Sequence, residues 1–276
     1  MAIISPKILQ TKLGFFTGSA IAACICLFTL TSLMPLKKAV EVNNYKVKTV
    51  VIDAGHGGKD PGCHGASNNE KAITLKVALQ LGKMIKTYMK DVKVIYTRES
   101  DKFIELNERA GIANRNKADV FISIHCNSVG TKTIKGSETY VMGPHKNESN
   151  LEVAKRENSV ILQEKNYLEK YDGFDPNSPL QHIFFANLQS VHQARSLQLA
   201  ESIEKQFVKK KGRNSRGVKQ AGFLVLWRTA MPSVLIEIGY LTNKTDEKYI
   251  GSENGQEFIA KSIYKAFRDY KLEMEE

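Results

Sequence analysis

The sequence predicts a single α/β domain with a mostly parallel sheet that helices cover on both faces. Short apolar runs alternate along the chain with longer segments of helical periodicity, as expected for β–α–β units. Several of the short runs are apolar throughout, which is typical of parallel strands that are buried on both faces. The chain has 276 residues, of which 42% are hydrophobic and 25% are charged, an ordinary composition for a globular protein.

Between residues 45 and 142, four apolar runs are predicted as strands and two periodic segments as helices. In the first helix, Ile73, Val77 and Leu81 recur at the spacing of one helix face. In the second, Leu106 and Ala110 have the same spacing. In chain order, we expect a strand at 48–53, a helix at 69–90, a strand at 92–97, a helix at 104–117, and strands at 120–125 and 138–142.

Residues 143–190 are predicted to form an insertion with a possible regulatory role. Residues 150–171 are charged and compatible with a helix, whereas two prolines exclude regular structure from residues 173–179. An insertion of this length between a strand and a helix is usually functional or mobile. After it, we expect a helix at 193–211, strands at 223–227 and 233–238, and a last helix at 255–270.

Residues 1–44 are predicted to be an export segment and a short linker, followed by the globular domain at 45–276. Residues 13–36 are uncharged and mostly apolar, and lysines flank them on both sides. This run is longer than the apolar core of a signal peptide and long enough to span a membrane. We therefore expect a signal anchor, with a cleaved signal peptide as the alternative, and an exported domain in either case.

The formal net charge of +11 suits an anionic partner such as a polymer or a membrane surface. The densest basic segment, residues 209–219, is also explained by a solvated helix end that complements the helix dipole. The sequence has no basic motif with interleaved aromatic residues, so nucleic acid is not expected as a partner.

Three strand-like runs carry residues at or near their ends that can bind a metal or transfer a proton. His56 follows the first strand in a glycine-rich turn, His125 ends the third strand, and Glu237 lies in the apolar run at 233–238. Because ligands bind at the carboxyl ends of parallel strands, these side chains can converge on one site. The alternative for each histidine is a hydrogen-bonded structural residue.

Glu237 is the least expected of the three, because a buried unpaired carboxylate is costly. It must be paired, protonated or linked to a metal, and burial near a cation is also how a glutamate becomes a general base. A structural salt bridge to Arg98 or Arg228 is the competing interpretation.

Glu70 begins the first long helix, where it could simply complement the helix dipole. The start of this helix and the end of the first strand lie on the same rim of the sheet, so Glu70 could also meet His56. Two histidines and one carboxylate form a known catalytic zinc set that leaves a position open for water.

Four further residues are candidates of second rank: Arg98, Arg109, Arg115 and Asn127. Arg98 and Asn127 follow strands and are candidates for substrate binding, although each could equally be structural. Cys63 and Cys126 could form a disulfide in an oxidising compartment or remain free thiols.

Four ordered motifs together resemble the zinc-dependent N-acetylmuramoyl-L-alanine amidases of the type 3 family. They are IDAGHGGKDPG at 52–62, NNEK at 68–71, SIHCNS at 123–128 and IEIGYLTN at 236–243. The resemblance implies that His56, Glu70 and His125 bind one zinc ion, that Glu237 is catalytic, and that the sheet has about six strands. It also implies a peptidoglycan substrate, cut at the amide between N-acetylmuramic acid and the L-alanine of the stem peptide.

The resemblance extends to biological role and regulation. It implies cell-wall turnover or daughter-cell separation outside the cytoplasm, in the periplasm. In the family's cell-division enzymes a helix covers the zinc until a protein activator displaces it. The hypothesis for this chain is that Glu157 or Glu164 of the insertion occupies the open zinc position, and the alternative is an ordinary surface helix.

Two other functions remain open from the residues alone. One is a zinc amidase or peptidase acting on a different amide. The other is a catalytically silent peptidoglycan-binding module, against which the presence of Glu237 argues.

Overall fold

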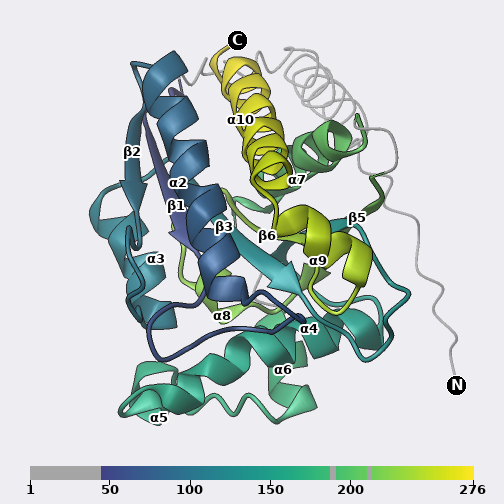
Figure 1. The fold of residues 1–276 in the computed structure, drawn as a ribbon. Helices are drawn as coiled ribbons and strands as arrows, with labels where there is room; N and C mark the ends of the chain where they lie inside the picture. The colour runs from purple at the N-terminus through teal and green to yellow at the C-terminus, as the bar shows by residue number, and fades with distance from the viewer. Residues whose placement is uncertain (1–44, 187–190, 210–212) are drawn as a thin grey trace, which may run out of the picture. The chain divides into compact units, whose positions relative to one another are not determined.

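A six-stranded sheet forms the centre of the computed structural model, which describes residues 45–276 apart from 187–190 and 210–212. The strand order is β2-β1-β3-β6-β4-β5 (Figure 1). The strands are β1 (Thr49–Ala54), β2 (Lys93–Tyr96), β3 (Val120–Asn127), β4 (Ser137–Met142), β5 (Ser215–Ala221) and β6 (Ser233–Tyr240). All neighbouring pairs are parallel except β4 with β6, which is antiparallel. The predicted α/β fold with a mostly parallel sheet is confirmed.

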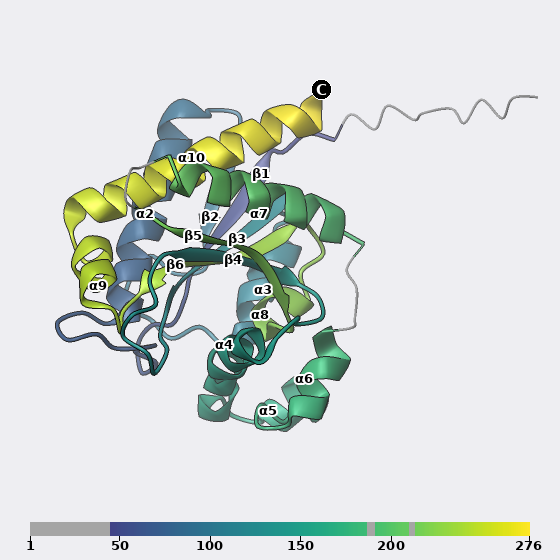
Figure 2. The same ribbon diagram turned by 90° about the vertical axis from the view of Figure 1, so that its right-hand side faces the viewer.

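Helices cover both faces of this sheet (Figure 2). One face carries three long helices: α2 (Glu70–Tyr88), α7 (Gln193–Phe207) and α10 (Glu253–Glu275). The other face carries α3 (Leu106–Arg115), α4 (Glu148–Asn158) and α8 (Leu224–Trp227). Each face buries its own hydrophobic core, as a sheet covered on both sides requires.

The alternation of side chains along β3 and β6 determines on which face of the sheet the candidate site residues lie. In β3, Ile122 and Ile124 belong to the core under α2, α7 and α10, whereas Phe121 belongs to the opposite core. Because successive side chains point to opposite faces, His125 lies on the same face as Phe121. In β6, Glu237 lies on that face too, two residues after Leu235.

The insertion contributes part of the cover over this second face. After α4 come a 3-10 turn, η1 (Ser159–Gln163), and the short helices α5 (Tyr167–Lys170) and α6 (Pro179–Ala186). Figure 1 shows these helices beyond the carboxyl ends of β1 and β3. Asn158 anchors α4 by donating to the carbonyl of Gly222 at 2.7 Å and accepting from the Leu224 amide at 2.9 Å.

The fifth strand lies elsewhere than predicted. The apolar residues 223–227 were expected to be a strand, but Leu224–Trp227 is the short buried helix α8. The strand is instead the polar segment Ser215–Ala221, at the edge of the sheet. A further helix, α9 (Lys244–Ile250), was not predicted.

Within the described part of the chain, no helix has both the length and the apolar character needed to cross a membrane. The predicted signal anchor at residues 13–36 lies outside the described residues.

Candidate metal centre

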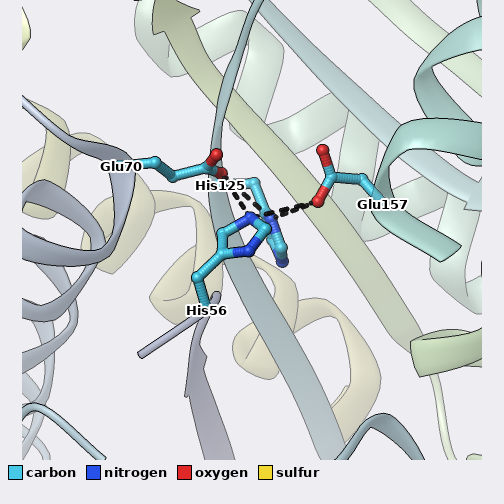
Figure 3. A group of neighbouring side chains, drawn as sticks. All are labelled: His56, Glu70, His125 and Glu157. Carbon is cyan, nitrogen blue, oxygen red and sulfur yellow. Dashed lines mark hydrogen bonds and ion pairs between the residues drawn. The ribbon is translucent and has the colours of Figure 1, made fainter. Parts of the chain in front are cut away.

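Four buried side chains from distant parts of the chain meet at the carboxyl ends of β1 and β3 (Figure 3). His56 follows β1, Glu70 begins α2, His125 lies in β3 and Glu157 lies in α4. Each offers one ligand atom, and these atoms all lie within 4.8 Å of one another. The structure thus brings together the three residues predicted as zinc ligands and adds a fourth from the insertion.

Asp60 fixes the orientation of the His56 ring. Its Oδ2 lies 2.7 Å from His56 Nδ1, so that Nε2 points toward Glu70 and Glu157. A carboxylate on the far nitrogen of a ligating histidine holds the ring and its tautomer in place. The sequence reasoning did not single out Asp60, although a carboxylate four residues after a candidate ligand was a usable signal.

A buried arginine supports the unusual backbone of His56. The φ angle of His56 is 62°, in the left-handed region. Its carbonyl accepts a hydrogen bond from Arg109 Nη2 at 2.9 Å, and Arg109 Nη1 also pairs with Asp53 at 2.8 Å. Non-glycine residues adopt this conformation only when the surroundings enforce it, so Arg109 and Asp53 form part of the support of the site.

Glu70 is held by two backbone amides. Its Oε1 accepts from the amide of Cys126 at 2.8 Å, and its Oε2 accepts from the amide of Cys63 at 2.9 Å. Oε1 also lies 3.1 Å from both His56 Nε2 and His125 Nδ1. The side chain therefore points into the cluster rather than into solvent, as a ligand would.

Two glycines let the chain pass close to these side chains. A Cβ on Gly55 would lie 2.4 Å from Cε1 of His125 and 2.5 Å from its Nε2. A Cβ on Gly62 would lie 2.6 Å from Oε2 of Glu70, and Gly62 has a φ of +67°. Neither position has room for a larger residue without displacing a ligand.

The donor set fits a zinc ion. Two imidazole nitrogens and carboxylate oxygens are ligands that zinc prefers. Among the described residues, His56 Nε2 and Glu157 Oε2 are buried and lack a hydrogen-bond partner, although they lie 3.2 Å apart. Buried polar atoms without partners are rare, and a cation between them would satisfy both.

The charged groups in the cluster shift one another's pKa values. Burial alone would lower the pKa of His125, but the negative charge of Glu157 raises it to about 9. Burial would also lower the pKa of His56, but the charge of Glu70 and the hydrogen bonds with Asp60, Glu157 and Glu70 together outweigh burial and raise it. Burial would raise the pKa of Glu157, whereas the neighbouring Arg156 lowers it. The carboxylates of the cluster therefore stabilise a positive charge placed between them.

Glu237 lies beside the cluster, fully buried in β6 and directly paired in register with His125. Burial and then the negative charge of Glu157 raise its pKa well above the ordinary value. Its Oε1 lies 3.3 Å from Arg156 Nη2, and its Oε2 lacks a hydrogen-bond partner. A carboxylate with a raised pKa and a free oxygen has the properties of a general base.

The arginine beside Glu237 is neither of the two considered from the sequence. Arg98 donates to the carbonyls of Ala54 and Gly55, and Arg228 pairs with the exposed Asp172. Arg156 lies in the charged insertion, where the sequence reasoning considered only glutamates.

Two glutamates were proposed for the open zinc position. Glu157 lies in the cluster, whereas Glu164 does not. Glu157 Oε2 lies 3.0 Å from His125 Nδ1. Glu164 instead accepts from the amide of Leu106, at the start of α3, and from the hydroxyl of Tyr171.

The second-rank candidates have structural partners. The buried guanidinium of Arg98 donates hydrogen bonds to backbone carbonyls. The buried side chain of Asn127 donates a hydrogen bond to Glu138. Neither contact supports the prediction that these residues bind substrate. Cys63 and Cys126 are free thiols, and Cys63 Sγ donates to the carbonyl of Cys126 at 3.0 Å.

Known proteins share both the sequence and the fold. YqiI of Bacillus subtilis (strain 168), an uncharacterized protein, is 31% identical over 246 residues, covering 89% of this chain and 94% of its own. The catalytic domain of CwlV, an N-acetylmuramoyl-L-alanine amidase from Bacillus (Paenibacillus) polymyxa var. colistinus, is 31% identical with a TM-score of 0.60. That match covers 81% of this chain and 97% of CwlV.

A second solved structure is the CwlD amidase from Clostridioides difficile in complex with the GerS lipoprotein. It is 25% identical, has a TM-score of 0.57, and covers 81% of this chain and 98% of its own. Residues 50–269 match the family described as N-acetylmuramoyl-L-alanine amidase, a range that holds the whole cluster. The chain therefore belongs to the N-acetylmuramoyl-L-alanine amidase family.

Proposed function

We propose that this chain is a zinc-dependent peptidoglycan hydrolase that cleaves the amide between N-acetylmuramic acid and the L-alanine of the stem peptide. One observation carries the proposal. His56, Glu70 and His125 converge at one end of the sheet, and Glu237 lies beside them as the register partner of His125. The family match over residues 50–269 supports this substrate over another amide, and the buried Glu237 supports an enzyme over a binding module.

His56, Glu70 and His125 would hold the zinc ion, with Asp60 fixing the ring of His56. At such a site zinc supplies an activated water and an electrophile for the scissile carbonyl. Glu237 takes the proton of the attacking water on its free Oε2 and returns it to the nitrogen of the leaving L-alanine. Its raised pKa suits both steps, because the same group must accept a proton and then donate it.

Replacing Glu237 by glutamine tests this assignment in the full chain. The variant keeps the side chain's size but cannot accept a proton, so hydrolysis of purified sacculi should fall by about 100-fold or more. Zinc content should not change. Glu201→Gln, on the exposed surface of α7, is the matched control. Full activity in the Glu237→Gln chain would refute the assignment.

We further propose that α4 holds the enzyme inactive. Glu157 occupies the position in the cluster that water or substrate would need, with Oε2 close to both histidines. The adjacent Arg156 approaches Glu237 and donates to the carbonyl of Ser128 at 2.8 Å. One helix turn therefore covers both the metal position and the general base.

Two substitutions on α4 separate this proposal from an ordinary surface helix. Glu157→Ala should raise the basal hydrolysis of sacculi by about 5- to 150-fold, the range that typical coupling energies give. Glu152→Ala changes the same helix on its exposed side and should leave the rate unchanged. Equal basal rates in both variants would contradict autoinhibition.

A protein partner is the proposed means of release. Within its described residues, the insertion exposes five large apolar side chains as a surface for such a partner: Leu162, Leu168, Leu180, Ile183 and Phe184. The similarity to the CwlD amidase, whose structure contains the GerS lipoprotein, supports a regulated complex.

The proposed location follows from the substrate, because peptidoglycan lies outside the cytoplasmic membrane. The apolar residues 13–36 support export through a signal anchor in that membrane, with the enzyme acting in the periplasm or its equivalent. The biological role proposed is cell-wall turnover or the separation of daughter cells.

A further inference from the structure

A pair of cations lies beside the proposed active site and has no role in the mechanism above. Arg216 Nε and Lys219 Nζ each lie 2.6 Å from Oε1 of Glu138, which is buried at the start of β4. Burial would raise the pKa of Glu138, but the Lys219 charge lowers it, so the carboxylate is ionised. Two cations share one carboxylate, which leaves one positive charge uncompensated. The side chains of Arg216 and Lys219 are 38% and 16% exposed, so an incoming anion can reach them.

An irregularity in β5 makes this pairing possible. Residues three apart on a regular strand point to opposite faces, so Arg216 and Lys219 should not meet. In the pairing of β4 with β5, Ser137 opposes Ser215 but Thr139 opposes Val218, so two residues of β5 face Glu138. The extra residue is accommodated at Gly217, whose φ is +80°. Bulges of this kind often redirect a side chain beside an active site.

The pair lies within reach of the reacting bond. Glu138 is the register partner of Glu237 in the antiparallel pairing of β4 with β6. The Cβ atoms of such partners are about 5 Å apart, and both side chains lie on the same face. Helix α4 packs against β5 over this face, as Figure 2 shows, so its displacement would open the path from Glu237 to the two cations.

We propose that Arg216 and Lys219 bind a carboxylate of the stem peptide, on the residue that follows the L-alanine; this inference rests on the proposed amidase function. The next Cα in a peptide lies about 3.8 Å beyond the previous one, so a carboxylate there can span the distance from Glu237 to the pair. In peptidoglycan this residue is a γ-linked glutamate whose α-carboxyl is either free or amidated. The pair therefore selects the free acid, through hydrogen bonds between charged groups.

Two disaccharide-tripeptides that differ only in this α-carboxyl, free or amidated, test the proposal. The full chain is assayed with and without Glu157→Ala, so that the site is open in one series. The free acid should be favoured about tenfold in kcat/KM, mainly through KM, since one charged hydrogen bond gives at least that factor. Lys219→Met and Arg216→Gln should each reduce this preference toward unity.

Two controls distinguish binding from a structural role. Lys219→Arg should keep the preference, and Lys205→Met, on the exposed surface of α7, should change nothing. A structural role would instead lower the rates on both substrates equally and leave their ratio intact, which would overturn the proposal. Equal cleavage of the two substrates by the Glu157→Ala chain, in which the site is open, would also overturn it. Cleavage of neither substrate by the Glu157→Ala chain would overturn the proposed amidase function itself.

Discussion

Gly55→Ala should disable zinc binding although it replaces none of the ligand residues. A Cβ at this position would lie 2.4 Å from Cε1, 2.5 Å from Nε2 and 2.7 Å from Nδ1 of His125. Ordinary van der Waals contact begins near 3.4 Å, so the imidazole must retreat by about 1 Å. Metal–ligand distances tolerate only about 0.2 Å. The displaced His125 can therefore no longer bind the ion together with His56 and Glu70.

The expected loss of zinc affinity is at least about 100-fold, or about 2.7 kcal/mol, because even disturbing a ligand's outer partners costs 10- to 100-fold. The measurement is competition for zinc with a chelator of known affinity, accompanied by thermal unfolding to verify the fold. Gly130→Ala is the matched control, since a Cβ there has no atom within 4 Å. Zinc affinity in Gly55→Ala within threefold of the control would refute the assignment of His125 as a ligand.

Three other predictions concern the support of the site. Asp60→Asn should lower zinc affinity by about 10- to 100-fold in the same competition assay, because the charged partner of His56 is lost; unchanged affinity would contradict this role. Arg109→Met should lower the free energy of unfolding in urea by about 3–5 kcal/mol, since it leaves Asp53 buried without its cation; Arg115→Met, at an exposed position on the same helix, should leave the free energy of unfolding nearly unchanged. Burial would raise the pKa of Asp53, but Arg109 and the hydroxyls of Ser123 and Thr97 together lower it below the ordinary value, so the stabilising effect of the carboxylate is complete at neutral pH and is lost as acid protonates it. The difference in unfolding free energy between the unsubstituted chain and Asp53→Asn should therefore shrink below about pH 4, and a constant difference down to pH 3 would contradict the pairing.

The sequence was sufficient where periodicity and burial agree. The strands β1, β3 and β6 are largely apolar runs buried on both faces, and two of their polar residues, His125 and Glu237, lie where the site forms. The predictions were wrong where the hydrophobic pattern of a segment does not match its structure. The edge strand β5 is mostly polar and pairs on one side only, so it lacks a strand's usual pattern. The apolar residues 223–227 include α8, a short helix that is largely buried. A short apolar run of this kind does not distinguish a buried helix from a strand.

Glu157 could have been chosen over Glu164 from the pattern of α4. Leu151, Ala154 and Glu157 lie three residues apart and are all buried, so they share one helix face. A charged residue on an otherwise apolar stripe needs a partner, which is the reasoning already applied to Glu237 in β6. Arg216 and Lys219 could not be paired in this way, because only the bulge in β5 brings them to the same face.

The attachment of Glu157 to the chain has a consequence for how activity can be controlled. A group tethered within one molecule meets its site at an effective concentration of about millimolar, whatever the amount of protein present. Dilution therefore cannot free the cluster, and a separate peptide with the sequence of residues 148–158 would have to reach about millimolar concentration to inhibit a chain lacking α4. Activity should follow the local concentration of whatever binds the insertion, so that hydrolysis begins where that partner is placed rather than when more enzyme is made.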